Sequence, residues 1–372
     1  MHKSRQSTPA RVVYLKNSSG TILKISRSRR LSGVRLYFLF FLLLVAAGSQ
    51  ACGAGHALVR GDTAELGLGS PGIAWFGPAS TNERATLGRW RMSVGPPIVS
   101  TTVASDPGAH DALTIVSWNT AVGEGDIVRF VRSLPQSDAP LVLLLQEVYR
   151  DGPEVPAPTD RGSEFTRQLG SRRADASNRE IDDAARALNL NVYYVPSMRN
   201  GNLSSAEDRG NAILSSLPLD ELRAMELPFE RQRRVAVAAT LRGRTSNGDT
   251  WRLRVVSAHL DNLGGIRRGW IGSEYGRARQ ARSLTELLRD DESTILAGDF
   301  NTWFGFSDQA YVETARAFPD TTVTDRRATF RGLLRLDHIF VRLVPGWHLD
   351  FHRASSRFGS DHYPLIGTLR FH

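Results

Sequence analysis

The pattern of apolar and polar positions from residue 113 onward predicts alternating strands and helices. Helical spacing of apolar side chains predicts helices over 126–134, 181–190 and 273–289. Short aliphatic and β-branched runs predict strands over 113–118, 141–145, 192–195, 212–214, 235–241, 253–258, 294–297, 339–343 and 363–369. Because strands outnumber helices and the helices fall between strand groups, the pattern favours two packed sheets with helices outside.

The N-terminal segment has a different pattern. Residues 1–51 carry nine basic side chains and no acidic one, and positions 36–47 are uninterruptedly apolar. Twelve residues are short for a spanning helix, which needs roughly 20, and suit a signal peptide. Ser49-Gln50-Ala51 fits a cleavage site, and Cys52 follows it as in a bacterial lipoprotein. We therefore expect export, with a cleaved signal, a lipoprotein anchor and an uncleaved membrane anchor as open alternatives.

Composition narrows the class of protein. The 372 residues are 41% apolar and 23% charged, as in globular proteins. The nine basic residues of 1–51 account for the whole excess of 47 Lys and Arg over 38 Asp and Glu, so global charge gives no support for DNA binding. One cysteine excludes an intramolecular disulfide and a cysteine-based zinc cluster. Gly, Pro and Ser are frequent in 52–110, which predicts a linker before a domain over 111–372.

Polar residues that can bind metal or move protons recur at the ends of the predicted strands. These segments are Trp118-Asn119, Gln146-Glu147, Arg209-Gly210-Asn211, His259-Leu260-Asp261, Gly298-Asp299-Phe300-Asn301, Asp337-His338 and Ser360-Asp361-His362. Each alone has a plain structural explanation, such as a solvated loop or a turn. Gathering several carboxylates in a packed domain costs desolvation energy, which a divalent cation offsets. Because the set is rich in oxygen and lacks thiolates, it favours Mg²⁺ or Mn²⁺ over zinc.

The same segments carry a family resemblance. Their order along the chain, and above all Gly-Asp-Phe-Asn at 298–301 followed by Ser-Asp-His-Tyr-Pro at 360–364, resembles the endonuclease/exonuclease/phosphatase superfamily. The resemblance covers roughly 110–372. It implies an α/β (α+β) fold, a four-layer α/β/β/α sandwich of two packed mixed sheets, and metal-dependent phosphoester hydrolysis, most simply of a phosphodiester.

The resemblance also implies roles for single residues. Glu147 is expected to be the primary metal ligand with Asn119 beside it. Because Asp361 directly precedes His362, it is expected to bind a second metal ion or tune the site. Arg209 and Asn211 are expected to contact substrate phosphate.

Proton transfer has two candidate bases, of which His362 with Asp337 is the leading one. A neutral His362 can accept a proton from water near neutral pH, with Asp337 orienting it. In parts of the family the aspartate that matches Asp299 is the proposed base, so the choice between Asp299 and His362 stays open. Asn301 would help Asp299 to hold the attacking water and a phosphoryl oxygen, and His259 would donate to a non-bridging or leaving oxygen.

Several functions remain compatible with these residues. The leading one is an exported phosphodiesterase, and a secreted nuclease and a sphingomyelinase-like lipid phosphodiesterase are specific forms of it. The substrate would be nucleic acid, a phospholipid head group or an inositol phosphate. The N-terminal segment would supply any membrane contact, and no protein partner is implied. A catalytically silent binding module of the same fold is the alternative outside the enzymes.

Overall fold

The computed structural model describes residues 13–16, 22–25, 57–61, 72–102, 108–157, 179–199, 206–262 and 273–371. The chain divides into two compact units, 1–54 and 55–372. In the first unit, β1 (Val13–Lys16) and β2 (Ile22–Ile25) pair in antiparallel fashion. The apolar run 36–47 and Cys52 lie outside the described residues. Among the residues that are described, no helix combines the length and apolar character needed to cross a bilayer.

The second unit contains two seven-stranded mixed sheets. The first sheet has the order β14-β13-β12-β11-β10-β4-β3, with β14 (Asp337–Arg342), β13 (Thr294–Asp299), β12 (Thr250–His259), β11 (Val235–Arg244), β10 (Asp220–Glu226), β4 (Ala74–Pro78) and β3 (Leu58–Arg60). The second has the order β15-β16-β6-β7-β9-β8-β5, with β15 (His348–Arg353), β16 (Leu365–Arg370), β6 (Ala112–Asn119), β7 (Leu141–Asp151), β9 (Glu207–Ser215), β8 (Asn191–Met198) and β5 (Ile98–Ser100).

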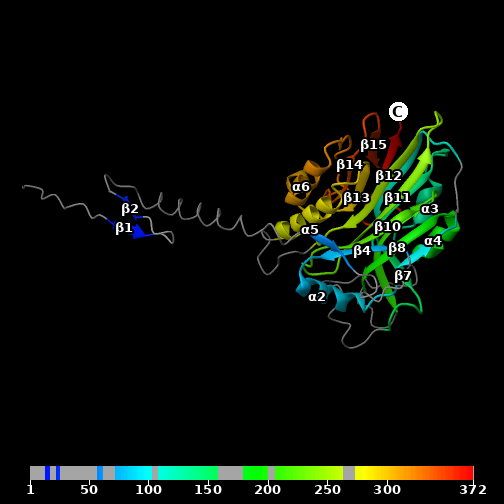
Figure 1. Ribbon diagram of the computed structural model, residues 1–372. Coiled ribbons are helices and arrows are strands. Elements are labelled where there is room, and N and C mark those ends of the chain that lie inside the picture. Colours follow the sequence, from blue (N-terminus) through cyan, green and yellow to red (C-terminus); the bar gives the residue numbers. More distant parts are fainter. Residues whose placement is uncertain are drawn as a thin grey trace, which may run out of the picture. The chain divides into compact units, whose positions relative to one another are not determined.

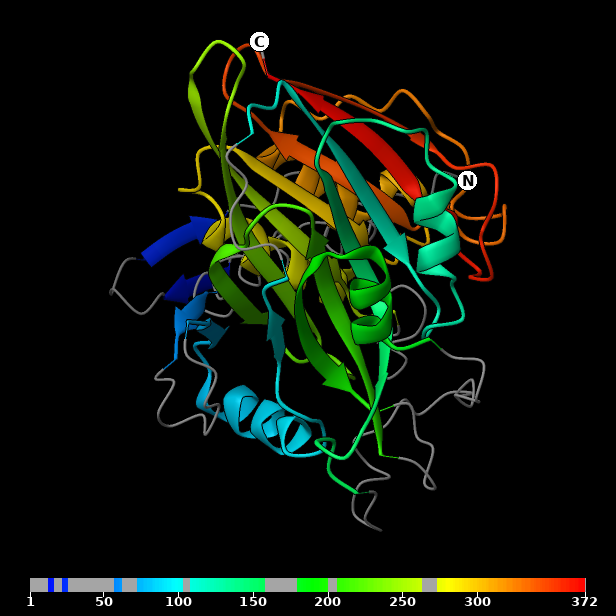
Figure 2. The ribbon, with the colours of Figure 1, turned by 90° about the vertical axis from the view of Figure 1, so that its right-hand side faces the viewer.

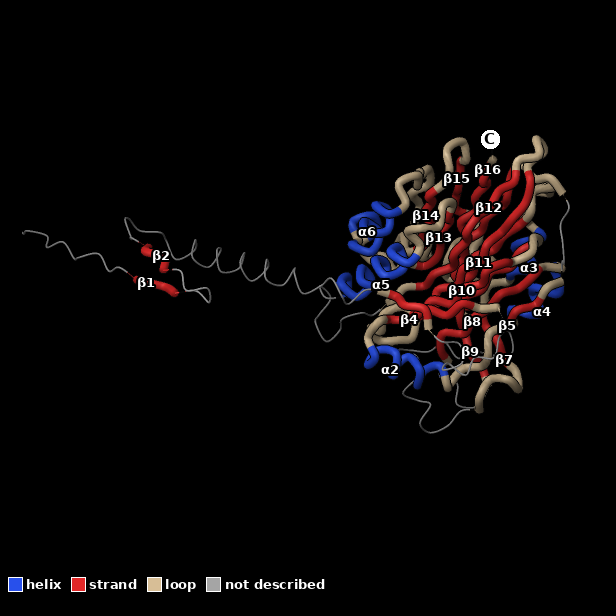
Figure 3. Tube along the Cα trace, in the orientation of Figure 1, coloured by secondary structure: helices blue, strands red, loops and turns tan. Residues whose placement is uncertain are grey.

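Helices cover the outer face of each sheet (Figures 1 and 3). The helices α5 (Ser273–Leu287) and α6 (Gln309–Ala317) pack on the first sheet, where Leu284 of α5 joins a core cluster with Val256 and Leu296. The short helices α3 (Ile127–Arg132) and α4 (Ile181–Leu188) pack on the second sheet, as the view in Figure 2 shows. The result is the α/β/β/α sandwich that the sequence predicted.

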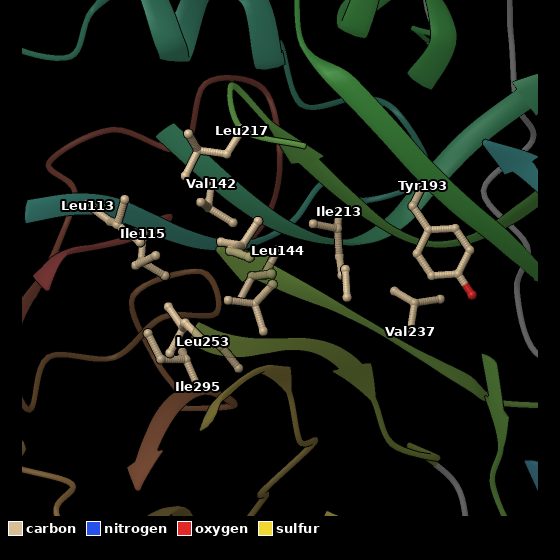
Figure 4. Close-up of a cluster of buried hydrophobic side chains, with 14 of the residues drawn as sticks. Leu113, Ile115, Val142, Leu144, Tyr193, Ile213, Leu217, Val237, Leu253 and Ile295 are labelled. Carbon is tan, nitrogen blue, oxygen red and sulfur yellow. The ribbon is translucent and has the colours of Figure 1, made fainter. Parts of the chain in front are cut away.

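The main core fills the space between the two sheets. Aliphatic side chains of β6, β7 and β9 face those of β11, β12 and β13, with Leu144, Leu253 and Ile295 all fully buried (Figure 4). Strands β7 and β12 are each buried on both faces, because one face packs on the opposite sheet and the other on helices. That two-sided burial explains why the run at 141–145 is continuously apolar rather than alternating.

The structure corrects the prediction of a linker over 52–110. The described part of that segment contains β3, β4, β5 and α2 (Thr81–Arg91), and its strands pair with the two sheets. Trp75 and Leu87 are buried there. Isolated large apolar residues among Gly, Pro and Ser are enough to attach the segment to the sandwich, although they produce no sustained periodicity.

Other elements differ in extent or were not predicted. Strand β9 begins at Glu207, so Arg209-Gly210-Asn211 lies within the strand and not before it. Strand β7 runs on to Asp151, well past the apolar run. The strands β10 and β15 are rich in charged residues that hide their alternation, and the sequence did not predict them.

Parallel pairing places the chemistry at one end of the sandwich. Strands β6 and β7 are parallel, with Asn119 opposite Gln146. Strands β12 and β13 are also parallel, with His259 opposite Asp299. Because the carboxyl ends of parallel strands meet at the same edge, four of the polar segments converge there. The antiparallel strand β14 begins at this edge with Asp337 opposite Asp299.

Candidate active site

A pocket of about 220 Å³ opens at this end of the sandwich. Seven of the residues singled out in the sequence line it, and these are Asn119, Glu147, His259, Asp299, Asn301, Asp361 and His362. They come from the ends of β6, β12 and β13, from β7, and from the loops after β13 and before β16. The expected convergence of distant segments is therefore observed. The other lining residues are Ala121, Asn262, Trp303, Phe330, Arg331 and Leu336.

His362 and Asp337 form a buried pair. Nδ1 of His362 lies 2.8 Å from Oδ2 of Asp337, which fixes the proton on Nδ1 and leaves Nε2 facing the other site residues. Asp337 is held in turn by Thr329, whose hydroxyl accepts a hydrogen bond from the Asp337 backbone N–H at 3.1 Å. The ring of Phe330 packs on the His362 ring at 4.9 Å between centroids. The imidazole is thus fixed in position from two sides.

Asp299 is the carboxylate at the centre of the pocket. Its Oδ2 accepts a hydrogen bond from Nδ2 of Asn119 at 3.0 Å, and its Oδ1 accepts one from the backbone N–H of Asn301 at 2.9 Å. Oδ2 also lies 3.5 Å from Nε2 of His259 and 3.8 Å from Nε2 of His362. Asp299 therefore lies within reach of both histidines.

The backbone before Asp299 admits only glycine. Gly298 has φ +148°, and a Cβ atom built there would lie 1.8 Å from the carbonyl oxygen of Ala258. The close approach of β12 and β13 at this point brings Asp299 next to His259. The glycine of the Gly-Asp-Phe-Asn motif thus has a steric cause.

Burial and neighbouring charges set the proton affinities. Burial, with Asp337 as a second cause, raises the pKa of Asp299 to about 7. For His362, burial opposes the charged form, but Asp337, Asp299 and Asp361 outweigh it and raise the pKa to about 10. Burial and the cation of Arg234 hold the pKa of His259 well below its ordinary value. In the protein without bound metal, His362 is therefore the cationic histidine at neutral pH and His259 the neutral one.

A β-bulge positions Glu147. The register of β7 against β9 shifts between Leu145 and Val148, and Glu147 has φ +50°. Its Oε2 lies 3.3 Å from Nη1 of Arg209, and its Oε1 lies 3.9 Å from Nδ1 of His259. The bulge breaks the alternation of the strand and turns this carboxylate into the pocket.

The two residues that were expected to bind substrate phosphate lie outside the pocket. Neither Arg209 nor Asn211 is among the residues that line the pocket. Arg209 is buried behind Glu147 and forms an ion pair with it. Asn211 donates a hydrogen bond from Nδ2 to the carbonyl oxygen of Val235 at 2.8 Å, which joins strands β9 and β11 of opposite sheets.

Two further residues support the site, and the sequence analysis gave them no role. The Ser360 hydroxyl donates to the carbonyl oxygen of Asn119 at 2.7 Å and accepts from the backbone N–H of His362 at 2.9 Å. Trp118 donates from Nε1 to the carbonyl oxygen of His362 at 3.0 Å. Both lie next to predicted site residues, and that adjacency is the only signal in the sequence that could have indicated them.

The donor set fits a hard divalent cation. Within the described residues, Asp299, Asp337 and His362 offer ligand atoms that all lie within 4.8 Å of one another. The carboxylates of Glu147 and Asp361 and the amide of Asn119 add further oxygen donors around the same pocket. Carboxylate and amide oxygens without thiolates are the ligands that Mg²⁺ and Mn²⁺ prefer.

One family model and several solved structures match the chain. A model of the Endonuclease/Exonuclease/phosphatase family matches residues 116–362. Among solved structures, the endonuclease/exonuclease/phosphatase from Beutenbergia cavernae DSM 12333 is 18% identical with a TM-score of 0.48, over 70% of this chain and 72% of that one. Sphingomyelinase C from Streptomyces griseocarneus is 16% identical with a TM-score of 0.44, over 69% and 99% of the two chains.

A third solved structure is the 3′-5′ exonuclease (NExo) from Neisseria meningitidis, which is 16% identical with a TM-score of 0.43 over 70% of this chain and 99% of that one. No curated protein matches the chain. The family model spans more than half of the 372 residues, and it includes every polar segment that lines the pocket. The chain therefore belongs to the Endonuclease/Exonuclease/phosphatase family.

Proposed function

We propose that this protein is an exported, metal-dependent phosphoester hydrolase, and most simply a phosphodiesterase. Membership of the family supports hydrolysis of a phosphoester. The observation that carries the proposal is the convergence of three carboxylates, three asparagines and two histidines on one pocket. A binding module has no need for a buried His–Asp pair aimed at a pocket carboxylate, so this arrangement favours catalysis over binding alone.

Glu147, Asn119 and Asp361 are the residues that would hold Mg²⁺ or Mn²⁺. Bound there, the cation would neutralise charge on a phosphoryl oxygen. Arg209 lies behind Glu147 and orients that carboxylate through their ion pair. The Asp299–Asp337–His362 group is the other set of close donors, but Nδ1 of His362 is already bound to Asp337, so we assign this group to proton transfer.

The charges in the pocket support Asp299 as the base. An imidazolium cannot accept a proton, and in the protein without bound metal the pKa of about 10 keeps His362 in that form at neutral pH. The pKa of Asp299, about 7, matches the pH at which a general base works best. Asp299 then takes the proton of the attacking water, and the His362 cation stabilises the negative charge that develops on the phosphoryl oxygens.

The remaining pocket residues support these two steps. Asn119 and the backbone N–H of Asn301 hold the two oxygens of Asp299, which fixes its orientation toward the water. His259 is neutral, because burial and Arg234 disfavour its charged form, and it would donate a hydrogen bond to a non-bridging or leaving oxygen. Export through the N-terminal segment, with a cleaved signal, a lipoprotein anchor or a membrane anchor, completes the proposal.

Hydrolysis of bis-p-nitrophenyl phosphate by the full chain tests the enzymatic part. We expect turnover with Mg²⁺ or Mn²⁺, loss of turnover with a chelator, and recovery when the metal is restored. Arg289→Gln serves as a control, because this exposed arginine of the loop after α5 pairs only with Glu286 among the described residues. Metal-replete protein that hydrolyses neither this diester nor DNA, RNA, sphingomyelin or inositol phosphates would be a binding module instead.

Fractionation of the producing cells tests export. Signal cleavage releases a shortened protein, whereas lipoprotein and membrane anchors leave it in the membrane fraction. Labelling with a radioactive fatty acid separates the lipoprotein, which requires Cys52, from the uncleaved anchor. Full-length protein found only in the cytoplasm would contradict this part of the proposal.

A further inference from the structure

A short hairpin forms one side of the pocket mouth. Phe330 and Leu334 exchange two backbone hydrogen bonds, of 2.8 and 3.2 Å, and close the turn between them. Phe330 and Arg331 of this hairpin both line the pocket. The roles proposed above for the pocket residues use neither side chain for contact with substrate.

The backbone of Arg331 is held in an unfavourable conformation. Its φ is +49°, and Gly332 follows with φ +73°. Left-handed backbone costs free energy for a residue with a Cβ atom, and glycine or asparagine takes such positions more readily. The backbone N–H of Arg331 donates to the carbonyl oxygen of Asp361 at 2.8 Å, which ties the strained residue to the segment that carries His362. Strain of this kind is concentrated at functional sites.

The guanidinium of Arg331 lies close to the reaction centre and remains accessible. Its central carbon is 5.1 Å from the centroid of the Phe330 ring, and that ring packs on His362. Nη2 lies 3.5 Å from Oδ2 of Asp361, and the other oxygen of this carboxylate is 3.8 Å from Nε2 of His362. The side chain is still 53% exposed.

The contact with Asp361 engages only part of the guanidinium. A distance of 3.5 Å is the outer limit of a hydrogen bond, and it involves one nitrogen of a group that carries five N–H donors. Asp361 is the one acidic partner of Arg331 among the described residues. The guanidinium therefore keeps donors for an anionic ligand at the pocket mouth.

Arginines are frequent in and around this hairpin, and two of them are ion-paired, Arg327 with Asp325 and Arg331 with Asp361. Residues 326–335 contain four arginines and no acidic residue. Arg326 and Arg335 both lie over the ring of Phe306, at 5.2 and 5.4 Å, beside the loop that carries Trp303. Neither of these two arginines lines the pocket, so Arg331 is the arginine of this segment that reaches the pocket mouth.

We propose that Arg331 forms a subsite for a second phosphate, next to the phosphoester held at the reaction centre. This inference rests on the proposed function and names its substrate class, which is a phosphoester whose neighbouring group carries another phosphate. Both a nucleic-acid strand and an inositol polyphosphate have this chemistry. A phosphocholine head group does not, because it carries a quaternary ammonium in place of a second phosphate. The guanidinium would repel that cation.

Equilibrium binding to the full chain with Mg²⁺ tests the subsite without requiring turnover. The probes are thymidine 3′,5′-bisphosphate against thymidine 3′- and 5′-monophosphate, and inositol 1,4-bisphosphate against inositol 1-monophosphate. We expect at least one bisphosphate to bind about tenfold or more tightly than its monophosphates, as one charge-assisted hydrogen bond gives. The pair with the larger advantage identifies the source of the second phosphate.

The variant Arg331→Gln should reduce that advantage to about twofold or less, and Arg331→Lys should keep part of it because the charge remains. Arg289→Gln should keep all of it. If Arg331 only neutralised Asp361, Arg331→Gln would weaken mono- and bisphosphate alike and leave the advantage intact, which would overturn the proposal. Equal binding of mono- and bisphosphates by the unaltered protein would overturn it as well. So would binding of phosphocholine that is tighter than binding of the bisphosphates.

The same preparations separate this inference from the proposed function. Hydrolysis of bis-p-nitrophenyl phosphate without any bisphosphate advantage would reject the subsite and keep the hydrolase. A bisphosphate advantage that depends on Arg331, in a protein without turnover on any phosphoester, would keep the subsite and reject the hydrolase. Thermal unfolding of each variant confirms that the comparison is made between folded proteins.

Discussion

The proton on His362 can be tested by removing the charge that holds it there. Asp337→Asn keeps the shape of the side chain and an oxygen that can accept from Nδ1–H, but it removes the nearest carboxylate, 2.8 Å away. The rise from an ordinary 6.5 to about 10 corresponds to roughly 5 kcal/mol of preference for the imidazolium. Burial opposes this preference, and Asp337 is the largest of the groups that produce it.

The expected result is a shift of the alkaline limb of the pH–rate profile. A nearby opposite charge changes a pKa by about 1–3 pH units, so the alkaline limb of bis-p-nitrophenyl phosphate hydrolysis should move down by that amount in Asp337→Asn. The acid limb, which we assign to Asp299, should move down slightly or not at all, because Asp337 is a lesser cause of its raised pKa than burial. Bound metal lowers the pKa values that set both limbs. The comparison therefore requires saturating Mg²⁺ in both proteins.

Folding stability gives an independent reading of the same proton. A histidine whose pKa is raised in the folded protein adds stability that is complete below pH 6.5 and is lost as the pH rises toward 10. This loss should be smaller in Asp337→Asn, as measured by urea unfolding at several pH values. An alkaline limb at the same pH in both proteins, but absent from His362→Asn, would refute the claim that Asp337 sets the charge of His362.

Four other substitutions test separate parts of the site. Asp299→Asn should lower kcat about 10²–10⁴-fold and remove the acid limb, and a retained limb would contradict its role as base. Glu147→Gln should raise the Mg²⁺ concentration for half-maximal activity by roughly tenfold or more, since even indirect partners of a metal site cost that much, and an unchanged Mg²⁺ titration would exclude it as a ligand. Asn211→Ala should lower the free energy of unfolding in urea by about 1–3 kcal/mol, because the Val235 carbonyl loses its partner. A variant that stays folded but loses most of its turnover would restore the substrate role of Asn211. Gly298→Ala should cost about 1–3 kcal/mol or more by forcing β12 and β13 apart, and a thermal unfolding temperature equal to that of the unaltered protein would show that the strands can adjust.

The sequence predicted the sandwich well where burial is two-sided. The apolar run at 141–145 and the helical spacing at 273–289 correspond to a central strand and to α5, because each faces a core along its whole length. Elements at the margins were missed, since β10 and β15 are rich in charged residues and α2 packs through only two buried residues. Local pattern therefore indicates the centre of this fold better than its edges.

The candidate site was predicted through position rather than geometry. Asn119, His259 and Asp299 end strands, and parallel pairing alone brings such ends together. Residues inside a strand gave a less reliable signal: Arg209 and Asn211 belong to the same motif, yet both lie behind the pocket. The bulge that turns Glu147 inward depends on register, and register with a partner strand cannot be seen in a single segment.

Because the chemistry is confined to one end of the sandwich, the opposite end offers room for engineering. The hairpin between β11 and β12 closes at Arg244–Thr250, while His259 lies at the far end of β12. Ten residues of strand separate the two by about 30 Å. A tag inserted at Ser246 to Asp249 would attach the protein to a support with its pocket facing the solution.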